Sequence, residues 1–145
     1  MRHRSREPGQ GLQPLRLPPG VDLRGALEQA ARDRAMAAFV ACGIGSLGDA
    51  RLRLAGAAEA TVVCGPCEII SLAGSLTPAG AHLHAAVADA QGRVHGGHLA
   101  AGNLVRTTAE LLLAWLPGWD LDRAFDPQTG HAELRVRAAP KGRDR

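Results

Sequence analysis

The sequence predicts an α+β fold, a single compact domain built on an antiparallel or mixed β-sheet with few helices. The chain has 145 residues, a length that suits one domain with a sizeable hydrophobic core. Short segments with strand-like patterns follow one another, mostly at hairpin spacing, and one segment alone has clear helical periodicity. Aromatic residues make up 3% of the chain and Tyr is absent, so Ala, Leu, Val and Gly are expected to fill the core.

The helix is predicted for residues 23–35, after a short strand at residues 15–17. Asp22 is a residue type that commonly caps a helix N-terminus. An apolar stripe at helical spacing follows it, and it consists of Leu23, Ala26, Leu27, Ala30 and Ala31.

The other elements are predicted to be strands and turns. Residues 36–44 form an apolar run and are expected to be a strand buried on both faces. Residues 105–116 fit a helix or a buried strand, and two consecutive threonines favour the strand. Residues 121–125 are expected to form a helical turn, followed by a tight turn at residues 126–130. The remaining predicted strands are residues 50–55 (half exposed), 61–64, 68–76 and 132–136.

The ends of the chain differ in composition from the domain predicted between them. Residues 1–12 are expected to be a disordered basic tail, residues 13–137 the domain, and residues 138–145 a flexible tail. The net charge is +3 and much of the excess lies near the ends, on Arg2, Arg4, Arg6, Lys141, Arg143 and Arg145. No central basic stripe is interleaved with aromatic residues, so the charge supports weak anion attraction and no more.

Nothing in the sequence predicts a membrane segment or an exported protein. It has no run of about 18 apolar residues and no charged-then-apolar leader pattern. Three cysteines, an odd number, fit a reducing compartment better than a disulfide framework. We therefore expect a cytoplasmic protein.

The segment with the most chemical content is residues 81–98, which reads as a β-hairpin. His82 and His84 are two apart and should share one face of a strand. The turn after Asp89 brings His98 back opposite Leu83, or beside His84 if the turn carries a one-residue bulge. In the bulged register three imidazoles converge, and three imidazoles with water form an open tetrahedral site for zinc or another divalent metal. The alternative is three ordinary histidines on a polar strand face.

Two further features of the same region bear on this prediction. Gly96 and Gly97 leave room for another backbone or a small ligand beside His98. His95 is three residues before His98 and is expected to face the other way.

A Cys-x-x-Cys pair is formed by Cys64 and Cys67. The spacing is that of dithiol redox sites, which need a helix starting at the first cysteine to lower its pKa. The residues that follow are β-branched and favour a strand. We therefore expect two small buried residues flanking a Gly-Pro bend, with redox catalysis and joint metal ligation with the histidines as the alternatives.

Several motifs together resemble those of the plant-and-prokaryote-conserved (PPC) domain. The resemblance covers roughly residues 15–136 and rests on their ordered succession: residues 43–52 (GIGSLGDARL), residues 68–76 (EIISLAGSL), His82-Leu-His84, Gly92-x-x-x-Gly96-Gly-His98, and residues 105–110 (VRTTAE). It implies a compact domain that assembles as a homotrimer, a metal site on His82, His84 and His98, and a role in DNA-binding proteins.

The sequence also departs from the plant members of that family. In those members the stretch matching residues 65–70 contacts partner proteins, and here Pro66 and Cys67 replace Arg and Phe while Glu68 matches. The AT-hook that grips A·T minor grooves is missing from this sequence. DNA binding is therefore expected to come from the basic tails, to be weak, and to depend on salt.

Two functions follow from these observations. The first is a non-enzymatic regulatory or DNA-binding module whose metal is structural or senses a ligand. The second is a zinc-dependent enzyme acting on a small keto or hydroxy acid, because the PPC fold is similar to that of acetolactate decarboxylase, a decarboxylating lyase. In the enzyme, Glu68 or Glu110 would be the acid/base and Arg106 would bind a substrate carboxylate. A deep pocket over the histidines favours the enzyme, and a shallow site favours the module.

Overall fold

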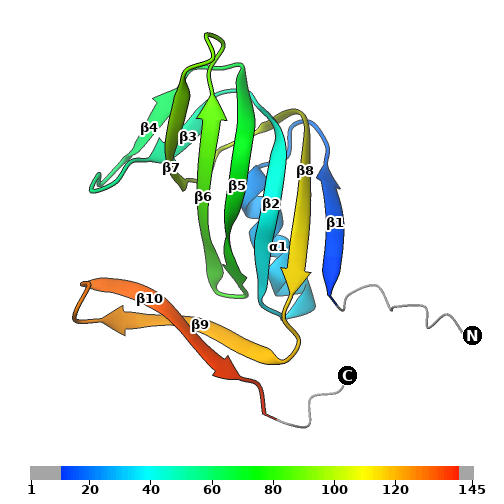
Figure 1. Cartoon of the computed structure of the whole chain (residues 1–145), viewed down its shortest axis with the longest axis vertical. Coiled ribbons are helices and arrows are strands. Elements are labelled where there is room, and N and C mark those ends of the chain that lie inside the picture. The colour runs from blue at the N-terminus through cyan, green and yellow to red at the C-terminus, as the bar shows by residue number, and fades with distance from the viewer. Residues whose placement is uncertain (1–10, 141–145) are drawn as a thin grey trace, which may run out of the picture.

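The computed structural model describes residues 11–140, which form one helix and ten strands (Figure 1). Residues 1–10 and 141–145, which make up most of the two predicted tails, lie outside the described residues. The helix is α1 (Leu23–Arg34). The strands are β1 (Leu12–Leu17), β2 (Ala38–Leu47), β3 (Ala50–Arg53), β4 (Ala60–Val63), β5 (Cys67–Thr77), β6 (Gly80–Ala88), β7 (Val94–Leu99), β8 (Val105–Trp115), β9 (Trp119–Asp126) and β10 (His131–Ala138).

Eight of the strands form one antiparallel sheet, in the order β1-β8-β2-β5-β6-β7-β3-β4. The strands β9 and β10 pair with each other in a separate two-stranded sheet that lies beyond one end of the large sheet (Figure 1). The predicted single α+β domain is confirmed, with its described strand pairs all antiparallel.

The helix α1 covers one face of the large sheet. It begins after Asp22, as predicted, but the Asp22 side chain makes no capping hydrogen bond and instead accepts from the Gly102 N–H at 3.2 Å. The helix ends at Ala35, whose left-handed backbone lets its N–H reach carbonyls of the last turn. Leu23, Leu27 and Ala31 are fully buried against the sheet. Burying a leucine side chain stabilises a fold by about 1.5–3 kcal/mol, so this stripe anchors the helix.

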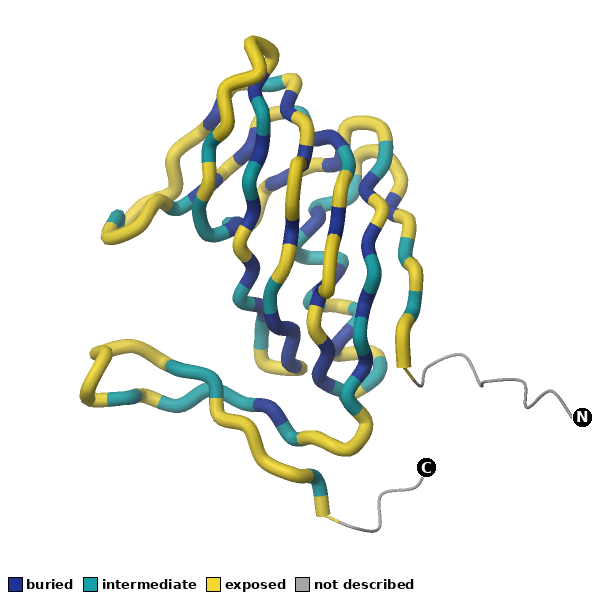
Figure 2. Tube along the Cα trace, viewed as in Figure 1, coloured by how far each residue is buried: buried dark blue, intermediate teal, exposed yellow. Residues whose placement is uncertain are grey.

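No helix within residues 11–140 covers the opposite face of the sheet, and buried and exposed residues alternate along its strands (Figure 2). The prediction of a strand at residues 36–44 is confirmed by β2, but the prediction that both of its faces are buried is wrong. Phe39 is 39% exposed and Ile44 is 56% exposed, because they point to the uncovered face. We call this surface the open face.

The predicted helical turn at residues 121–125 is also wrong, because those residues belong to β9. In residues 119–126, the apolar side chains of Trp119, Leu121 and Phe125 occupy odd-numbered positions and three aspartates occupy even-numbered ones, and this period of two is the signal of a strand. The predicted turn at residues 126–130 is confirmed, with backbone N–H groups of Thr129 and Gly130 donating to the Asp126 carbonyl. The described residues contain no helix that is both long and apolar enough to cross a membrane.

Candidate metal centre

The three histidines lie on the hairpin formed by β6 and β7, in the bulged register of the two predicted. His84 is directly opposite His98. Asp89 fixes the turn, because its Oδ1 accepts hydrogen bonds from the backbone N–H groups of Gln91 (2.9 Å) and Arg93 (3.0 Å). The backbone N–H of Asp89 also donates to the Arg93 carbonyl at 2.9 Å. This tight turn makes the register specific, and a slip of one residue would turn His98 to the other face.

Two glycines let the neighbouring strands approach the hairpin closely. A Cβ on Gly97 would lie 2.8 Å from the carbonyl oxygen of Arg53 on β3. On β5, Gly74 has φ +150°, and a Cβ there would overlap the His82 carbonyl oxygen. The prediction that glycine next to His98 leaves room for another backbone is confirmed at Gly97. Gly96 has more space, since its nearest neighbour would be 3.7 Å away.

The imidazole rings converge on one point of the open face. The Nε2 atoms of His82 and His84 are 3.2 Å apart, and one ring nitrogen from each histidine lies within 4.8 Å of the others. The centroid of the His98 ring is 5.2 Å from that of His82 and 4.5 Å from that of His84. Zinc binds imidazole at about 2.0–2.1 Å with tetrahedral angles, which places ligand nitrogens roughly 3.4 Å apart. The donor set and its spacing therefore fit one divalent cation with a free position.

The surroundings favour the neutral, ligating form of two of these rings. Burial lowers the pKa of His82, and the positive charge of Arg123 lowers it further. Burial also lowers the pKa of His98, with a second contribution from Arg53. A neutral imidazole offers a lone pair to a metal, whereas a protonated one does not.

His95 lies outside this cluster, as predicted. Its Nε2 is 3.0 Å from Asp89 Oδ2, on the carboxylate that fixes the turn. Arg93 Nε donates to the same oxygen at 2.8 Å. These contacts hold the pKa of Asp89 below its ordinary value, with the His95 hydrogen bond as the largest cause.

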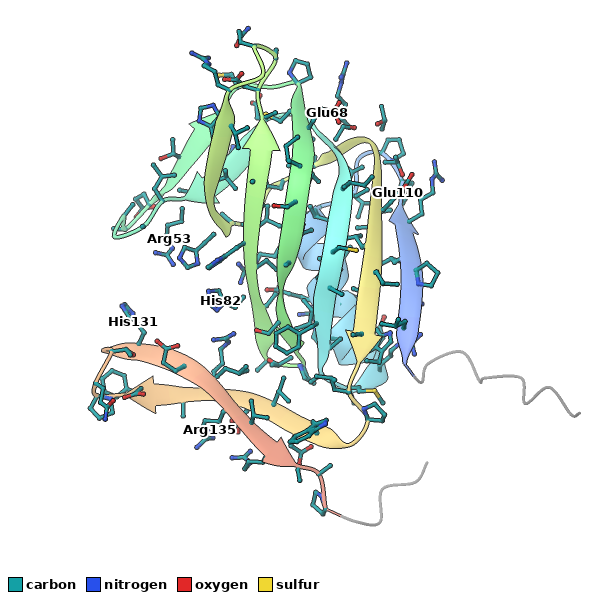
Figure 3. All side chains as sticks on the ribbon, in the orientation of Figure 1. Arg53, Glu68, His82, Glu110, His131 and Arg135 are labelled. Atoms are coloured by element: carbon teal, nitrogen blue, oxygen red, sulfur yellow. The ribbon has the colours of Figure 1, made fainter. Side chains whose placement is uncertain are left out.

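A pocket of about 1190 Å³ adjoins the histidine cluster. His82 and His98 line it from the sheet, Arg53 lines it from β3, and Figure 3 shows Arg53, His82 and His131 around the space between the sheet and the β9–β10 hairpin. Other charged residues in its lining are Arg24, Glu28, Arg123 and Glu133. A second hollow, of about 580 Å³, lies between the open face and the same hairpin, next to His82 and His84.

Comparison with known proteins identifies the family of the chain. The family model of the Plants and Prokaryotes Conserved (PCC) domain matches residues 5–117, which include all three histidines. The chain belongs to this family. It is the family, abbreviated PPC above, that the sequence motifs resemble.

The PCC domain of this chain also has curated and structural relatives. It is 50% identical over 124 residues to "Bifunctional protein GlmU" of Synechococcus sp. (strain JA-3-3Ab), a match that covers 85% of this chain and 20% of that protein. The chain thus spans about a fifth of the length of the curated relatives that it matches.

Three solved structures show the same fold over most of both chains. A hypothetical protein from Salmonella enterica is 38% identical, with a TM-score of 0.84 and coverage of 88% of this chain and 93% of that one. A protein from Archaeoglobus fulgidus described as metal-containing is 28% identical, with a TM-score of 0.72 and coverage of 88% and 94%. A candidate DNA-binding protein from Ralstonia eutropha JMP134 is 27% identical, with a TM-score of 0.71 and coverage of 86% and 90%.

The predicted acid/base and substrate-binding residues lie elsewhere in the PCC domain. Glu68 on β5 and Glu110 on β8 are exposed and lie toward the opposite end of the sheet from His82 (Figure 3). Arg106 is exposed on β8. None of the three lines the pocket beside the histidines.

The pocket contains charged residues that the sequence reasoning missed. Arg53 follows Leu52 on a strand that the sequence did predict, but its position opposite His98 depends on which strand pairs with β7. Arg123, His131 and Glu133 come from β9 and β10. The spacing of Trp119, Leu121 and Phe125 at odd-numbered positions, with three aspartates at even-numbered ones, is the sequence signal for that hairpin.

The two cysteines of the Cys-x-x-Cys pair differ in their surroundings. Cys67 is buried and burial raises the pKa of its thiol, which opposes thiolate chemistry. Cys64 is exposed, so the prediction that both are buried is wrong for Cys64. Within residues 11–140 the histidine cluster includes neither cysteine.

Proposed function

We propose that this PCC-domain protein is a regulatory module that holds one divalent cation, zinc first, on His82, His84 and His98. The observation that carries the proposal is the convergence of three ring nitrogens within 4.8 Å. The description of the Archaeoglobus fulgidus relative as metal-containing supports it. When bound, the cation would supply a Lewis acid with one position open to the adjoining pocket.

The test of the metal site is elemental analysis of the purified protein together with a zinc-competition titration. We expect one zinc per chain in the wild type and a loss of affinity of more than about 100-fold in His82→Ala, since even indirect ligand contacts change affinity 10–100-fold. His95→Ala is the matched control, because this histidine lies on the same hairpin outside the cluster. Full zinc content in His82→Ala would contradict the assignment.

We also propose that the protein is a homotrimer in which neighbouring copies cover the apolar part of the open face, away from the histidine cluster. Phe39, Ile44 and Ile70 are exposed by 39%, 56% and 53%, and large apolar side chains exposed together are typical of subunit interfaces. Analytical ultracentrifugation is expected to give three times the chain mass. Ile44→Asp should dissociate the assembly, and Val62→Asp on the edge strand β4 should not. A monomeric wild type would refute this part of the proposal.

The macromolecular partner that we propose is DNA, bound through the basic ends of the chain. The net charge of +3 and the description of the Ralstonia eutropha relative as a candidate DNA-binding protein support this partner. Because a trimer multiplies each weak contact, binding should exceed that of one chain and fall steeply with salt.

Fluorescence anisotropy with a plain duplex across a salt series tests the DNA proposal. Replacing Arg2, Arg4 and Arg6 by Gln should reduce both the affinity and its dependence on salt. The same three substitutions should leave the zinc content unchanged. Binding that is undetectable at the lowest salt would remove DNA from the function.

A second candidate function is favoured by the pocket. It adjoins His82 and His98 and contains the carboxylate of Glu133, so the cavity that a zinc-dependent enzyme needs is present. The substrate class remains a small keto or hydroxy acid, with decarboxylation as the reaction. Glu133 takes the acid/base role in place of Glu68 or Glu110, because it alone of the three lines the pocket.

Carbon dioxide release from a panel of small 2-hydroxy-3-keto acids tests the enzyme. Zinc-dependent turnover that falls by about 10²-fold or more in Glu133→Gln, but persists in Glu110→Gln, would support it. An absence of turnover in the zinc-loaded wild type would favour the module.

A further inference from the structure

Two arginines flank the histidine cluster on opposite sides. Arg53 on β3 is the cross-strand partner of His98 on β7. On the other side of the cluster, Ser75 on β5 is the cross-strand partner of His82, and Arg123 Nη2 donates to Ser75 Oγ at 2.9 Å. In the strand order β5-β6-β7-β3, the histidines therefore lie between the two guanidinium groups. Both arginines line the same pocket.

Neither guanidinium is neutralised by a carboxylate within residues 11–140. The ion pairs in this part of the chain join other residues. Arg53 Nη1 donates to the Ala57 carbonyl at 3.2 Å, and Arg123 Nη1 reaches the Ala132 carbonyl at 3.5 Å. A guanidinium has five N–H donors, so each arginine keeps several that these contacts do not use.

Arg24 lines the same pocket, but all of its guanidinium nitrogens have partners within the protein, in contrast to Arg53 and Arg123. Its Nε donates to Glu28 Oε1 at 3.0 Å, and its Nη atoms donate to the carbonyls of Leu99 and Ala81, both at 2.8 Å. Arg24 and Glu28 therefore balance each other and tie α1 to the sheet. Arg53 and Arg123 have no such balance.

The remaining carboxylate in the pocket lining is Glu133. Its Oε1 accepts a hydrogen bond from Thr129 Oγ1 at 2.9 Å, which holds it within its own hairpin. Two unpaired guanidinium groups against one carboxylate leave the pocket with an excess of positive charge before any cation binds. A cation on the histidines would add to that excess. Clefts lined by one sign of charge concentrate small ions of the opposite sign.

The geometry points to a binding site for a small organic anion, whose carboxylate or phosphate group is held by Arg53 and Arg123 over the three histidines. This inference rests on the proposed metal site, because the anion is expected to fill the free position of the bound cation. Planar guanidinium donors match both kinds of oxyanion and often bind them through two parallel hydrogen bonds. A cavity of about 1190 Å³ is large enough for a ligand of this kind.

The inference also gives the β9–β10 hairpin a role. Arg123 and Glu133 lie beyond residue 117, where the match to the family model ends. Selectivity for the ligand therefore depends on a segment outside the matched domain, whereas the histidines lie inside it.

Calorimetric titration of the zinc-loaded protein tests the inference, with malonate and inorganic phosphate as anionic probes and malonamide as the neutral control. We expect one or both anions to bind and malonamide not to bind. Arg53→Gln and Arg123→Gln should each weaken binding of the anion by about tenfold or more, as is typical for loss of a hydrogen bond to a charged group. Arg16→Gln, which removes the same charge on the distant edge strand β1, should bind as the wild type does.

The relative affinities of malonate and phosphate distinguish a carboxylate ligand from a phosphate ligand. Equal anion affinity in the wild type and both pocket variants would overturn the inference, as would malonamide binding as tightly as malonate or no binding of either anion.

Zinc content, measured on every variant, separates this inference from the metal proposal. Arg53→Gln and Arg123→Gln should retain one zinc per chain. If the wild type holds no zinc, the metal proposal fails, and the same titrations on the metal-free protein then decide the anion site. Anion binding by the metal-free protein that is lost or weakened in Arg53→Gln and Arg123→Gln would support the anion site. Anion binding that is equal in the wild type and both variants would refute the anion site.

Discussion

The two hairpins that meet at the pocket are built in different ways. The β6–β7 hairpin lies inside the large sheet, with β5 and β3 on either side, and its core-facing residues are buried. The β9–β10 hairpin pairs only with itself, and Leu121 is its one buried residue. Surface ion pairs link its two strands, since Asp122 accepts from Arg135 at 2.7 and 2.8 Å and from Arg137 at 2.8 Å.

Because of this difference, the β6–β7 hairpin is expected to be rigid and the β9–β10 hairpin is expected to adapt to a ligand. A metal site loses affinity when its ligands must be reorganised, so imidazoles on a central hairpin would be held ready for the proposed ion. A hairpin with little buried area can shift at small cost, so the side chains of Arg123 and Glu133 can adjust to a ligand. The positions of the imidazoles are thus fixed by the core, whereas the shape of the pocket wall is not.

The largest effect that would test this comparison is the loss of the metal. His98→Ala on β7 should lose most of its bound zinc, whereas His131→Ala on β10 should keep one zinc per chain, because His131 lines the pocket outside the cluster. Elemental analysis of both variants after desalting is the measurement. Equal zinc loss from both would mean that the two hairpins share the ion.

The next largest effect is on the packing beside β7. Gly97→Ala should lower the free energy of unfolding by about 1–3 kcal/mol, since its Cβ would lie 2.8 Å from the Arg53 carbonyl oxygen and force β3 and β7 apart. Gly96→Ala is the matched control and should change it by less than about 0.5 kcal/mol. Urea unfolding measures the free energy of unfolding of both variants. If Gly97→Ala and Gly96→Ala are equally stable, close packing of β3 against β7 at Gly97 is not what holds the β6–β7 hairpin in place.

A smaller effect is expected at the turn of the same hairpin. The hydrogen bonds from His95 and Arg93 hold the pKa of Asp89 below its ordinary value of 3.8. A carboxyl whose pKa is lowered by folding stabilises the fold above its unfolded pKa, and that contribution is lost as the pH falls below it. Asp89→Asn should therefore lower the melting temperature by on the order of 5 °C at pH 7, with the difference from wild type shrinking below about pH 4.

Melting curves at pH 7, 5, 4 and 3 measure this difference. Glu59→Gln, an exposed carboxylate in the β3–β4 connection, is the control and should follow the wild type. A gap that stays constant down to pH 3 would show that the Asp89 charge does not stabilise the turn.

The smallest effect concerns the β9–β10 hairpin. The hydrogen bonds from Arg135 and then Arg137 lower the pKa of Asp122 to about 2, but the group is near the surface, where ion pairs contribute little. Asp122→Asn should leave the melting temperature within about 2 °C of wild type. Amide exchange should become faster in residues 119–138 and stay unchanged in β6 and β7. Faster exchange throughout the sheet would mean that the two hairpins open together.

The parts of the molecule that the sequence predicts well are those governed by local rules. The His82–His84 spacing and the Asp89 turn depend on the two-residue period of a strand and on turn chemistry, so the histidine cluster could be predicted before its partners were known. The helix from Leu23 was found for the same reason, since its cap and its stripe are contiguous in the chain.

The sequence predicts poorly those features that depend on what surrounds each strand, namely the exposure of residues and the contacts between distant segments. An apolar run such as β2 has the same composition whether its second face meets a core or the open face, so the exposure of Phe39 and Ile44 could not be inferred. Arg53 became a pocket residue only through the pairing of β3 with β7, a contact between distant segments. Glu68 and Glu110 both lie in motifs of the family resemblance, and membership of a motif carries no information about a residue's distance from the histidines.

The link between the sheet and the β9–β10 hairpin has a consequence for how such proteins diversify. Only residues 116–118 connect β8 to β9, so the sequence of the β9–β10 hairpin can vary without disturbing the large sheet. If Arg123 and Glu133 contact a ligand as proposed, substitutions in this hairpin would change which ligand binds while the three histidines stay in place. Related proteins that share these histidines are therefore expected to differ in the ligands that they recognise, and the difference should lie in the segment that matches residues 119–138.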